Sequence, residues 1–181
     1  MYPIAELTMK DGRKMRFELY PDAAPNTVAS FAALCRDGFF DGLIFHRVVK
    51  DYIIQSGSPV GSCGGSKAPF FIRGEFAANG FENPIKHTRG TISMARRREN
   101  DSASTQIFIV HKTAERLDGK YAAFGRICDD ESFAVLDEIA SVETLPPEME
   151  NRPLVPQVIQ SFRVIENGWK ISEPDRLLGE E

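Results

Sequence analysis

Short apolar runs recur along most of this 181-residue chain, separated by joints rich in glycine, and this pattern limits the chain to folds built mainly from short strands. The clearest run is 14–20, where apolar and charged residues alternate as in a strand with one buried face. Residues 4–9 are expected to pair with it across Asp11-Gly12, because this dipeptide tolerates the positive φ of a tight hairpin turn. Further strands are expected at 43–49, 52–55, 91–96, 106–110, 122–127 and 158–165.

Helical periodicity is found in two segments. In the first, apolar residues follow at i, i+3, i+4 and i+7 from Val28, and we expect Asn26 to cap its start and Gly38 to end it. The second helix is expected at 130–141. Because two helices are too few to cover a parallel sheet, the sequence predicts a mainly-β sandwich or barrel.

The composition is typical of one globular domain, with 42% apolar residues, 27% charged residues and a net charge of −4. The slight acidic excess gives no electrostatic reason to expect nucleic acid or an anionic membrane as a partner. The first residues lack the basic and apolar regions of a signal peptide, and no run is long and apolar enough to cross a bilayer. We therefore expect a cytoplasmic protein whose three widely spaced cysteines are reduced.

Three segments are expected to lie at the surface. The basic run 96–98 is interpreted as a solvated loop, and segment 143–156, which is rich in proline and glutamate, as a surface loop. We assign residues 1–166 to one domain and residues 167–181 to a polar tail, and we expect the part after Trp169 to be loosely held.

No familiar catalytic set is complete in the sequence. His46, His87 and His111 lack the spacing of a metal site, and there is no G-x-S-x-G elbow. The glycine-rich stretch 57–65 lacks the Lys-Ser/Thr ending of a phosphate-binding loop. A hydrolase or metal enzyme that uses His46 and a cysteine stays open as an alternative, since distant segments could bring these side chains together.

An apolar run from Ile44 to Val49 carries an unusual pair of basic residues. This run and three later segments resemble, in order and spacing, the signature of the cyclophilins. The matching motifs are Phe45-His46-Arg47-Val48 with Gln55-x-Gly57, then Gly90-Thr91-Ile92-Ser93-Met94-Ala95-Arg96, then Ser102-Ala103-Ser104-Thr105-Gln106-Ile107-Phe108-Ile109, and then Leu117-Asp118-Gly119-Lys120-Tyr121-Ala122-Ala123-Phe124-Gly125. Each motif alone is weak, but together they are specific, and the similarity covers roughly residues 4–165.

The resemblance implies a closed antiparallel barrel of about eight strands, capped by a helix at each end, with an active groove on its outer face. It implies that Arg47 is the catalytic arginine and that Gln55 lies beside it. By the same resemblance, the apolar pocket for a proline ring consists of Tyr52, Ile53, Phe108 and Leu117. The other groove residues are Ala95 and Arg96, on a strand whose backbone binds the substrate, the polar Gln106, Tyr121 in place of a frequent histidine, and Arg116 in place of a frequent tryptophan.

The activity that the resemblance implies is peptidyl-prolyl cis/trans isomerisation in peptides and folding proteins. An arginine donates a hydrogen bond to the prolyl nitrogen, and no cofactor, metal or covalent intermediate is needed. We expect a monomer that binds cyclosporin weakly, because Arg116 replaces the tryptophan that bonds this drug. Segment 66–71 differs from the common loop and receives no role. The alternative is a non-catalytic cyclophilin-like module that binds proline-containing segments.

Overall fold

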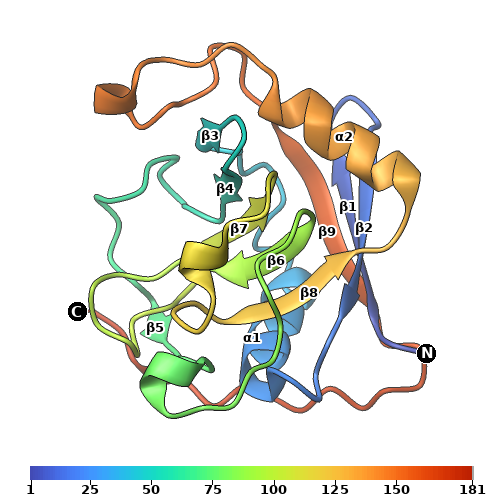
Figure 1. Cartoon of the computed structure of the whole chain (residues 1–181), viewed down its shortest axis with the longest axis vertical. Helices are drawn as coiled ribbons and strands as arrows, with labels where there is room; N and C mark the ends of the chain where they lie inside the picture. Colours follow the sequence, from blue (N-terminus) through green and yellow to red (C-terminus); the bar gives the residue numbers. More distant parts are fainter. Residues whose placement is uncertain (181) are drawn as a thin grey trace.

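Eight antiparallel strands form one strongly curled sheet in the computed structural model, which describes residues 1–180 (Figure 1). The strands are β1 (Ile4–Met9), β2 (Lys14–Leu19), β3 (Arg47–Val49), β4 (Ile53–Ser56), β6 (Thr91–Met94), β7 (Ile107–Val110), β8 (Ala123–Ile127) and β9 (Ile159–Ile165). They are ordered β3-β4-β7-β6-β8-β2-β1-β9 across the sheet. Two short strands, β5 (Phe70–Phe71) and β10 (Leu177–Leu178), pair separately.

The predicted eight-stranded antiparallel sheet is confirmed, although the barrel is less fully closed than expected. The edge strands β3 and β9 do not pair along their lengths. Instead, an isolated bridge joins Ile44 to Val158, and the Phe45 N–H donates to the Gln157 carbonyl at 3.0 Å. Closure therefore depends on residues 42–45, which precede β3, and on residues 157–159 at the start of β9.

The two predicted helices are α1 (Pro25–Arg36) and α2 (Asp130–Ala140), and they lie at different ends of the sheet (Figure 1). Phe31 of α1 lies against the rings of Phe40, Phe124 and Phe162, with centroid distances of 4.9 to 5.6 Å. Gly38 ends α1 as predicted, because its φ of +69° is a conformation that glycine adopts without strain.

The predicted cap of α1 is wrong. Pro25 occupies the first helical turn, so Asn26 lies inside the helix, where its side chain cannot cap. The side chain of Glu75 takes this role, accepting hydrogen bonds from the backbone N–H of Thr27 at 2.6 Å and of Asn26 at 3.3 Å. The Asn26 amide instead bonds the backbone of Asp175 in both directions, at 2.9 and 2.8 Å. The helix start is thus tied to two distant segments.

The tail is not loosely held, contrary to expectation. Trp169 stacks on Tyr2, with ring centroids 5.7 Å apart, and its indole N–H donates to the Met1 carbonyl at 2.9 Å. Further along, β10 pairs with β5. In Figure 1 the tail runs along the lower edge of the molecule, from beside the N-terminus to β5. Aromatic stacking and backbone pairing fix this polar segment over much of its length.

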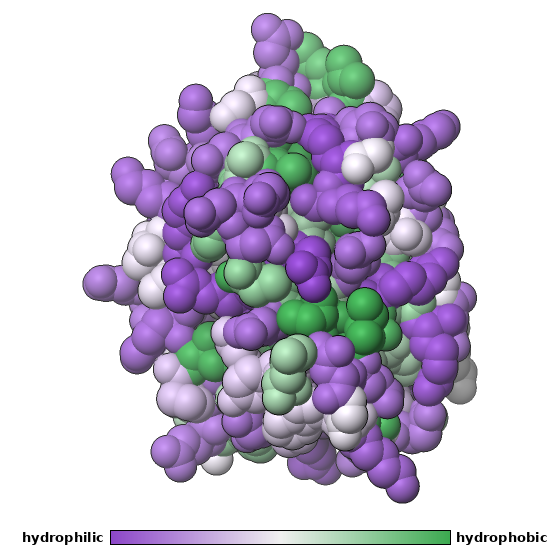
Figure 2. Space-filling model, turned by 90° about the vertical axis from the view of Figure 1, so that its right-hand side faces the viewer, coloured by the Kyte–Doolittle hydropathy of each residue, from purple (hydrophilic) through white to green (hydrophobic). Residues whose placement is uncertain are grey.

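Polar and charged side chains cover most of the face in Figure 2, where apolar side chains form small, separate groups. The large apolar residues lie mainly in the core between the sheet and the helices. Within residues 1–180, no helix combines the length and apolar character required to span a membrane.

Candidate functional site

An apolar pocket lies between β4, β7 and the short 3₁₀ helix Glu115–Leu117. In the sheet register Ile53 lies opposite Val110, and Gln55 lies opposite Phe108. Phe108 and Leu117 are only 4% and 6% exposed, and they pack with Ile53, Val110 and Ala114 in a cluster separate from the main core. Such a concave apolar surface has the chemistry needed to hold a small ring.

The pocket opens into a cavity of about 560 Å³. Ten of the eleven predicted site residues line it: Arg47, Tyr52, Ile53, Gln55, Ala95, Arg96, Gln106, Phe108, Leu117 and Tyr121. The fold thus brings together residues from five segments of the chain, at 47, 52–55, 95–96, 106–108 and 117–121. We refer to this cavity, with its pocket, as the groove.

A chain of polar side chains positions Arg47. Its strand partner is Gln55, whose Oε1 accepts from Arg47 Nη1 at 3.4 Å. The Gln55 amide donates to Gln106 Oε1 at 2.9 Å, and Gln106 donates to the Cys63 carbonyl at 3.2 Å. Among the ion pairs of residues 1–180, none contains Arg47. Its guanidinium therefore keeps N–H donors for a ligand at the mouth of the pocket.

The surroundings of Gly57 explain why the Gln55-x-Gly57 motif ends in a glycine. Its φ is +93°, and a Cβ at this position would collide with the backbone of Thr105. The Thr105 hydroxyl donates to the Gly57 carbonyl at 2.8 Å. This close approach keeps the residues that follow β4 against those that precede β7, and so keeps Gln55 beside Gln106.

Arg116 is the predicted site residue that lies outside the groove lining. Its guanidinium carbon stands 4.3 Å from the ring centroid of Tyr52, a cation–π distance. It therefore lies over the Tyr52 ring, which itself lines the groove.

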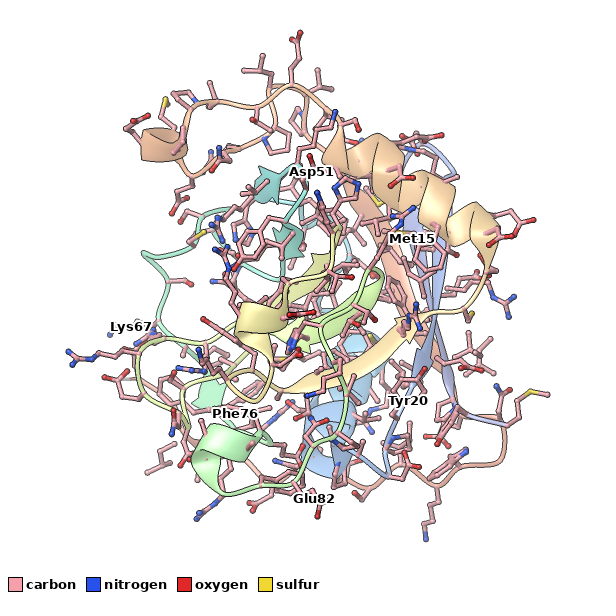
Figure 3. The ribbon with its side chains drawn as sticks, viewed as in Figure 1. Met15, Tyr20, Asp51, Lys67, Phe76 and Glu82 are labelled. Atoms are coloured by element: carbon pink, nitrogen blue, oxygen red, sulfur yellow. The ribbon has the colours of Figure 1, made fainter. Side chains whose placement is uncertain are left out.

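The basic run 96–98 is a loop in which Arg97 and Arg98 are exposed, as predicted, whereas Arg96 is partly buried and held by several contacts. The Arg96 guanidinium donates to the carbonyls of Lys120, Arg97 and Arg98 at 2.9 to 3.1 Å. It also lies 4.7 Å from the ring centroid of Tyr121 and 5.0 Å from that of Phe76, which is labelled in Figure 3. Arg96 thus fixes the wall of the groove at Tyr121.

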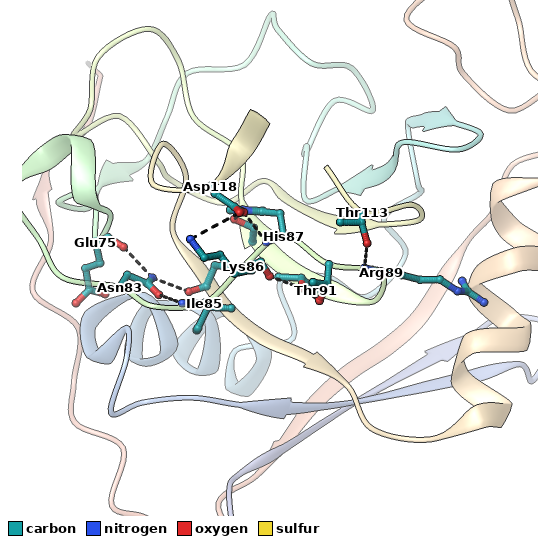
Figure 4. Close-up of polar contacts among 12 residues, drawn as sticks. Glu75, Asn83, Ile85, Lys86, His87, Arg89, Thr91, Thr113 and Asp118 are labelled. Carbon is teal, nitrogen blue, oxygen red and sulfur yellow. Dashed lines mark hydrogen bonds and ion pairs between the residues drawn. The ribbon is translucent and has the colours of Figure 1, made fainter. Parts of the chain in front are cut away.

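His87 supports the groove, although sequence reasoning does not find it. Its ring stacks behind Phe108, with centroids 5.9 Å apart. One ring nitrogen lies 3.0 Å from the Ser93 hydroxyl and the other 3.1 Å from Asp118, as Figure 4 shows for the Asp118 contact. Burial lowers the pKa of His87 despite the nearby carboxylate, so the ring is neutral and supports Phe108 near neutral pH. No spacing rule could find it, because Asp118 is 31 residues away.

The possible histidine–cysteine pair is not supported by the local chemistry. His46 is fully buried, neither ring nitrogen has a hydrogen-bond partner within residues 1–180, and burial lowers its pKa to about 4. Cys63 lines the groove, but burial and then Glu150 raise the pKa of its thiol. A nucleophilic pair needs a thiolate beside an imidazolium, and both shifts oppose that state.

Comparison with known proteins identifies the family. The family model described as "Cyclophilin type peptidyl-prolyl cis-trans isomerase/CLD" matches residues 4–164. The chain belongs to this family. Its relatives include peptidyl-prolyl cis-trans isomerase B of Bacillus subtilis, 40% identical over 126 residues that cover 70% of this chain and 84% of the relative. Another is peptidyl-prolyl cis-trans isomerase 10 of Caenorhabditis elegans, 38% identical over 154 residues, with 84% and 90% covered.

The fold of this cyclophilin also matches solved structures. A Cryptosporidium parvum cyclophilin-type isomerase, solved in the presence of the dipeptide Ala-Pro, superimposes with a TM-score of 0.75 at 24% identity, covering 90% of this chain and 98% of the other. The family match and the named relatives support peptidyl-prolyl cis-trans isomerase activity for this chain.

Burial of neutral His46 should make the stability of this cyclophilin depend on pH. The pKa of His46 is about 4 when folded, against about 6.5 when unfolded, so the unfolded state binds more protons in between. The contribution of His46 is complete above about pH 6.5 and is lost as the pH falls towards 4. Between pH 7 and 4.5 the free energy of unfolding should fall by about 2–3 kcal/mol because of His46.

Urea unfolding of the wild type and of His46→Gln at both pH values measures this effect. The quantity compared is the change in the free energy of unfolding between the two pH values, so any pH-independent loss of stability in the variant cancels. The pKa of His87 is lowered in both proteins, so its contribution to the pH dependence cancels in the comparison. Equal pH dependence in the two proteins would show that His46 does not titrate as its burial requires.

Proposed function

We propose that this cyclophilin accelerates rotation about Xaa-Pro bonds in peptides and folding proteins through a hydrogen bond from Arg47 to the prolyl nitrogen. The observation that carries the proposal is the position of the Arg47 guanidinium, held by Gln55 beside the apolar pocket of Phe108 and Leu117. A proline ring in this pocket would place its nitrogen near a permanent cation.

The barrier to rotation, about 18–20 kcal/mol, arises because the nitrogen lone pair is delocalised into the carbonyl. In the twisted state the lone pair becomes localised, and it can then accept a hydrogen bond from Arg47. This bond exists mainly in the transition state, and differential binding of this kind raises the rate. The pocket holds the ring still while the carbonyl side turns. No proton is transferred and no covalent bond forms.

A protease-coupled assay on a short, uncharged proline peptide, with and without a chelator, tests the proposal. Turnover that the chelator leaves unchanged agrees with it. Binding of the peptide without turnover would instead support the non-catalytic module. Turnover that the chelator abolishes would indicate a metal enzyme and would contradict the proposed mechanism.

The rate should be nearly independent of pH. Arg47, Gln55 and Gln106 do not change charge near neutrality. Burial lowers the pKa of His46 to about 4, so its ring stays neutral above about pH 5.5, and burial raises the pKa of Cys63, which disfavours the thiolate. With an uncharged peptide, kcat/KM should stay within about a factor of two or three over this range, since an obligatory general base would give a sigmoid or bell.

The pH profile is measured for the wild type and for His46→Gln. A tenfold change centred near pH 6.5 that disappears in His46→Gln would show that His46 takes part in the reaction.

A further inference from the structure

The charged side chains that line the groove, among residues 1–180, are all cationic. They are Arg47, Lys67, Arg96 and Arg97, and no aspartate or glutamate of the described chain lines the groove with them. Glu180, which is not part of the lining, forms an ion pair with Arg97. The whole protein carries 26 acidic and 22 basic residues. A concave surface of one sign in a protein of the opposite net charge concentrates counter-charged ligands.

Beyond the proline pocket the groove continues between two walls, which we call the groove extension. One wall is segment 63–69, which includes Lys67 on the side away from α2 (Figure 3), and the other contains Arg97, Ser102 and Ser104. The two walls include residues 66–69 of the 66–71 loop and Arg97 of the basic run, to which the proposed function gives no role.

One buried hydroxyl in the groove extension lacks a partner within residues 1–180. The Ser102 hydroxyl donates to the Glu99 carbonyl and accepts from the Arg97 N–H, and Thr105 donates to Gly57. The Ser104 oxygen is buried and has no hydrogen-bond partner within residues 1–180. Buried polar atoms are normally paired, so this hydroxyl indicates a place for a polar group of a ligand.

The tail shows which chemistry the outer side of this wall accepts. The backbone N–H of Glu180 donates to the Ala68 carbonyl at 2.9 Å, and its carboxylate accepts from the Ala68 N–H at 2.9 Å. The same carboxylate binds both terminal nitrogens of Arg97, at 2.6 and 2.8 Å. These contacts lower the pKa of Glu180 to about 2. One carboxylate of the tail is thus held by wall backbone and Arg97 together.

We propose that the groove extension is a subsite for an acidic side chain of the substrate, with Arg97 as the specificity-determining residue and Ser104 as an additional donor. This inference rests on the proposed isomerase function, because the acidic residue belongs to the peptide whose proline occupies the pocket. Glu180 shares the Arg97 guanidinium from the other side, so the tail weakens the positive charge offered to the substrate.

The test uses proline peptides that are identical except for glutamate or glutamine, placed in turn two or three residues from the proline on each side. The measured quantity is the ratio of kcat/KM for the glutamate peptide to that for its glutamine partner. At low ionic strength the best position should give a ratio of about two to five, as expected for an exposed arginine that binds a carboxylate. The ratio should fall towards one in high salt.

Two variants, each with one partner of the Arg97–Glu180 ion pair replaced, distinguish a substrate subsite from a purely structural role of that pair. Arg97→Gln should lower the ratio to near one, whereas Glu180→Gln should keep it or raise it, because Arg97 is released from its competitor. Ser104→Ala should lower the ratio less than Arg97→Gln does, by about twofold at most. If the pair only braces the wall, both Arg97→Gln and Glu180→Gln should change the ratio in the same direction, and this result would overturn the subsite.

A ratio of one at every position in the wild type would also overturn the subsite while leaving the isomerase function intact. If the glutamine peptides are not turned over, the proposed function fails. In that case fluorescence anisotropy gives the Kd of each peptide, and the ratio of Kd for the glutamine peptide to Kd for the glutamate peptide still decides whether an acidic side chain is preferred.

Discussion

Replacing Arg47 with alanine should lower kcat/KM for a proline peptide by about two or more orders of magnitude, the effect seen when a main transition-state donor is removed. The guanidinium is the charged group at the mouth of the apolar pocket, and Gln55 holds it there. Gln55 and Gln106 remain to bond each other in the variant. The loss should therefore appear in catalysis rather than in folding.

The coupled assay measures this loss, and urea unfolding measures stability, which should change by less than about 1 kcal/mol. Arg16→Ala is a matched control, because Arg16 is a half-exposed arginine of β2 that lies 3.9 Å from Asp129 and does not line the groove. It should keep full activity. Near-normal turnover of Arg47→Ala would show that another group supplies the hydrogen bond to the prolyl nitrogen.

Much of the sheet could be predicted because its strands carry a local signal. The alternation in 14–20 and the Asp11-Gly12 turn locate the first hairpin, and the 3.6-residue period locates both helices. The strand boundaries carry a weaker signal. Residues 43–46, which are expected to form a strand, form a single bridge at Ile44, because they join the ends of the curled sheet.

The groove residues follow from the family resemblance and not from periodicity. Phe108 and Leu117 are almost fully buried, so their burial alone does not distinguish them from core residues. Arg47 is the exception, since an arginine in an apolar strand needs a partner or a groove. The motif contains both Arg47 and Gln55, and the sheet register pairs the two residues.

The contacts that could not be predicted join segments far apart in the chain. Glu75 caps α1 from 48 residues away from Thr27, and Glu180 bonds Ala68 across 112 residues. A carboxylate that finds a distant backbone N–H leaves no pattern in its own neighbourhood. For the same reason the sequence predicts a loosely held tail, although the tail forms one edge of the β5–β10 pair.

Cyclosporin should inhibit this cyclophilin weakly, and Arg116→Trp should tighten its binding by about ten- to a hundredfold. The family resemblance implies a tryptophan that bonds the drug at this position, and Arg116 here lies over the Tyr52 ring instead. An indole would supply both a hydrogen-bond donor and a large apolar contact, together worth roughly 1–3 kcal/mol. The guanidinium is strongly hydrated in comparison and offers little apolar area.

The Kd for cyclosporin, measured by calorimetry for the wild type, Arg116→Trp and Arg116→Ala, tests whether the missing indole causes the weak binding. Arg116→Ala removes the cation from Tyr52 without adding an indole, so its Kd should stay within about threefold of the wild type. A large gain in Arg116→Ala would mean that the arginine repels the drug, and the attraction of an indole would then not be the cause. Nanomolar inhibition of the unaltered protein would show that the pocket of Phe108 and Leu117 suffices, and that the residue at position 116 does not decide the affinity.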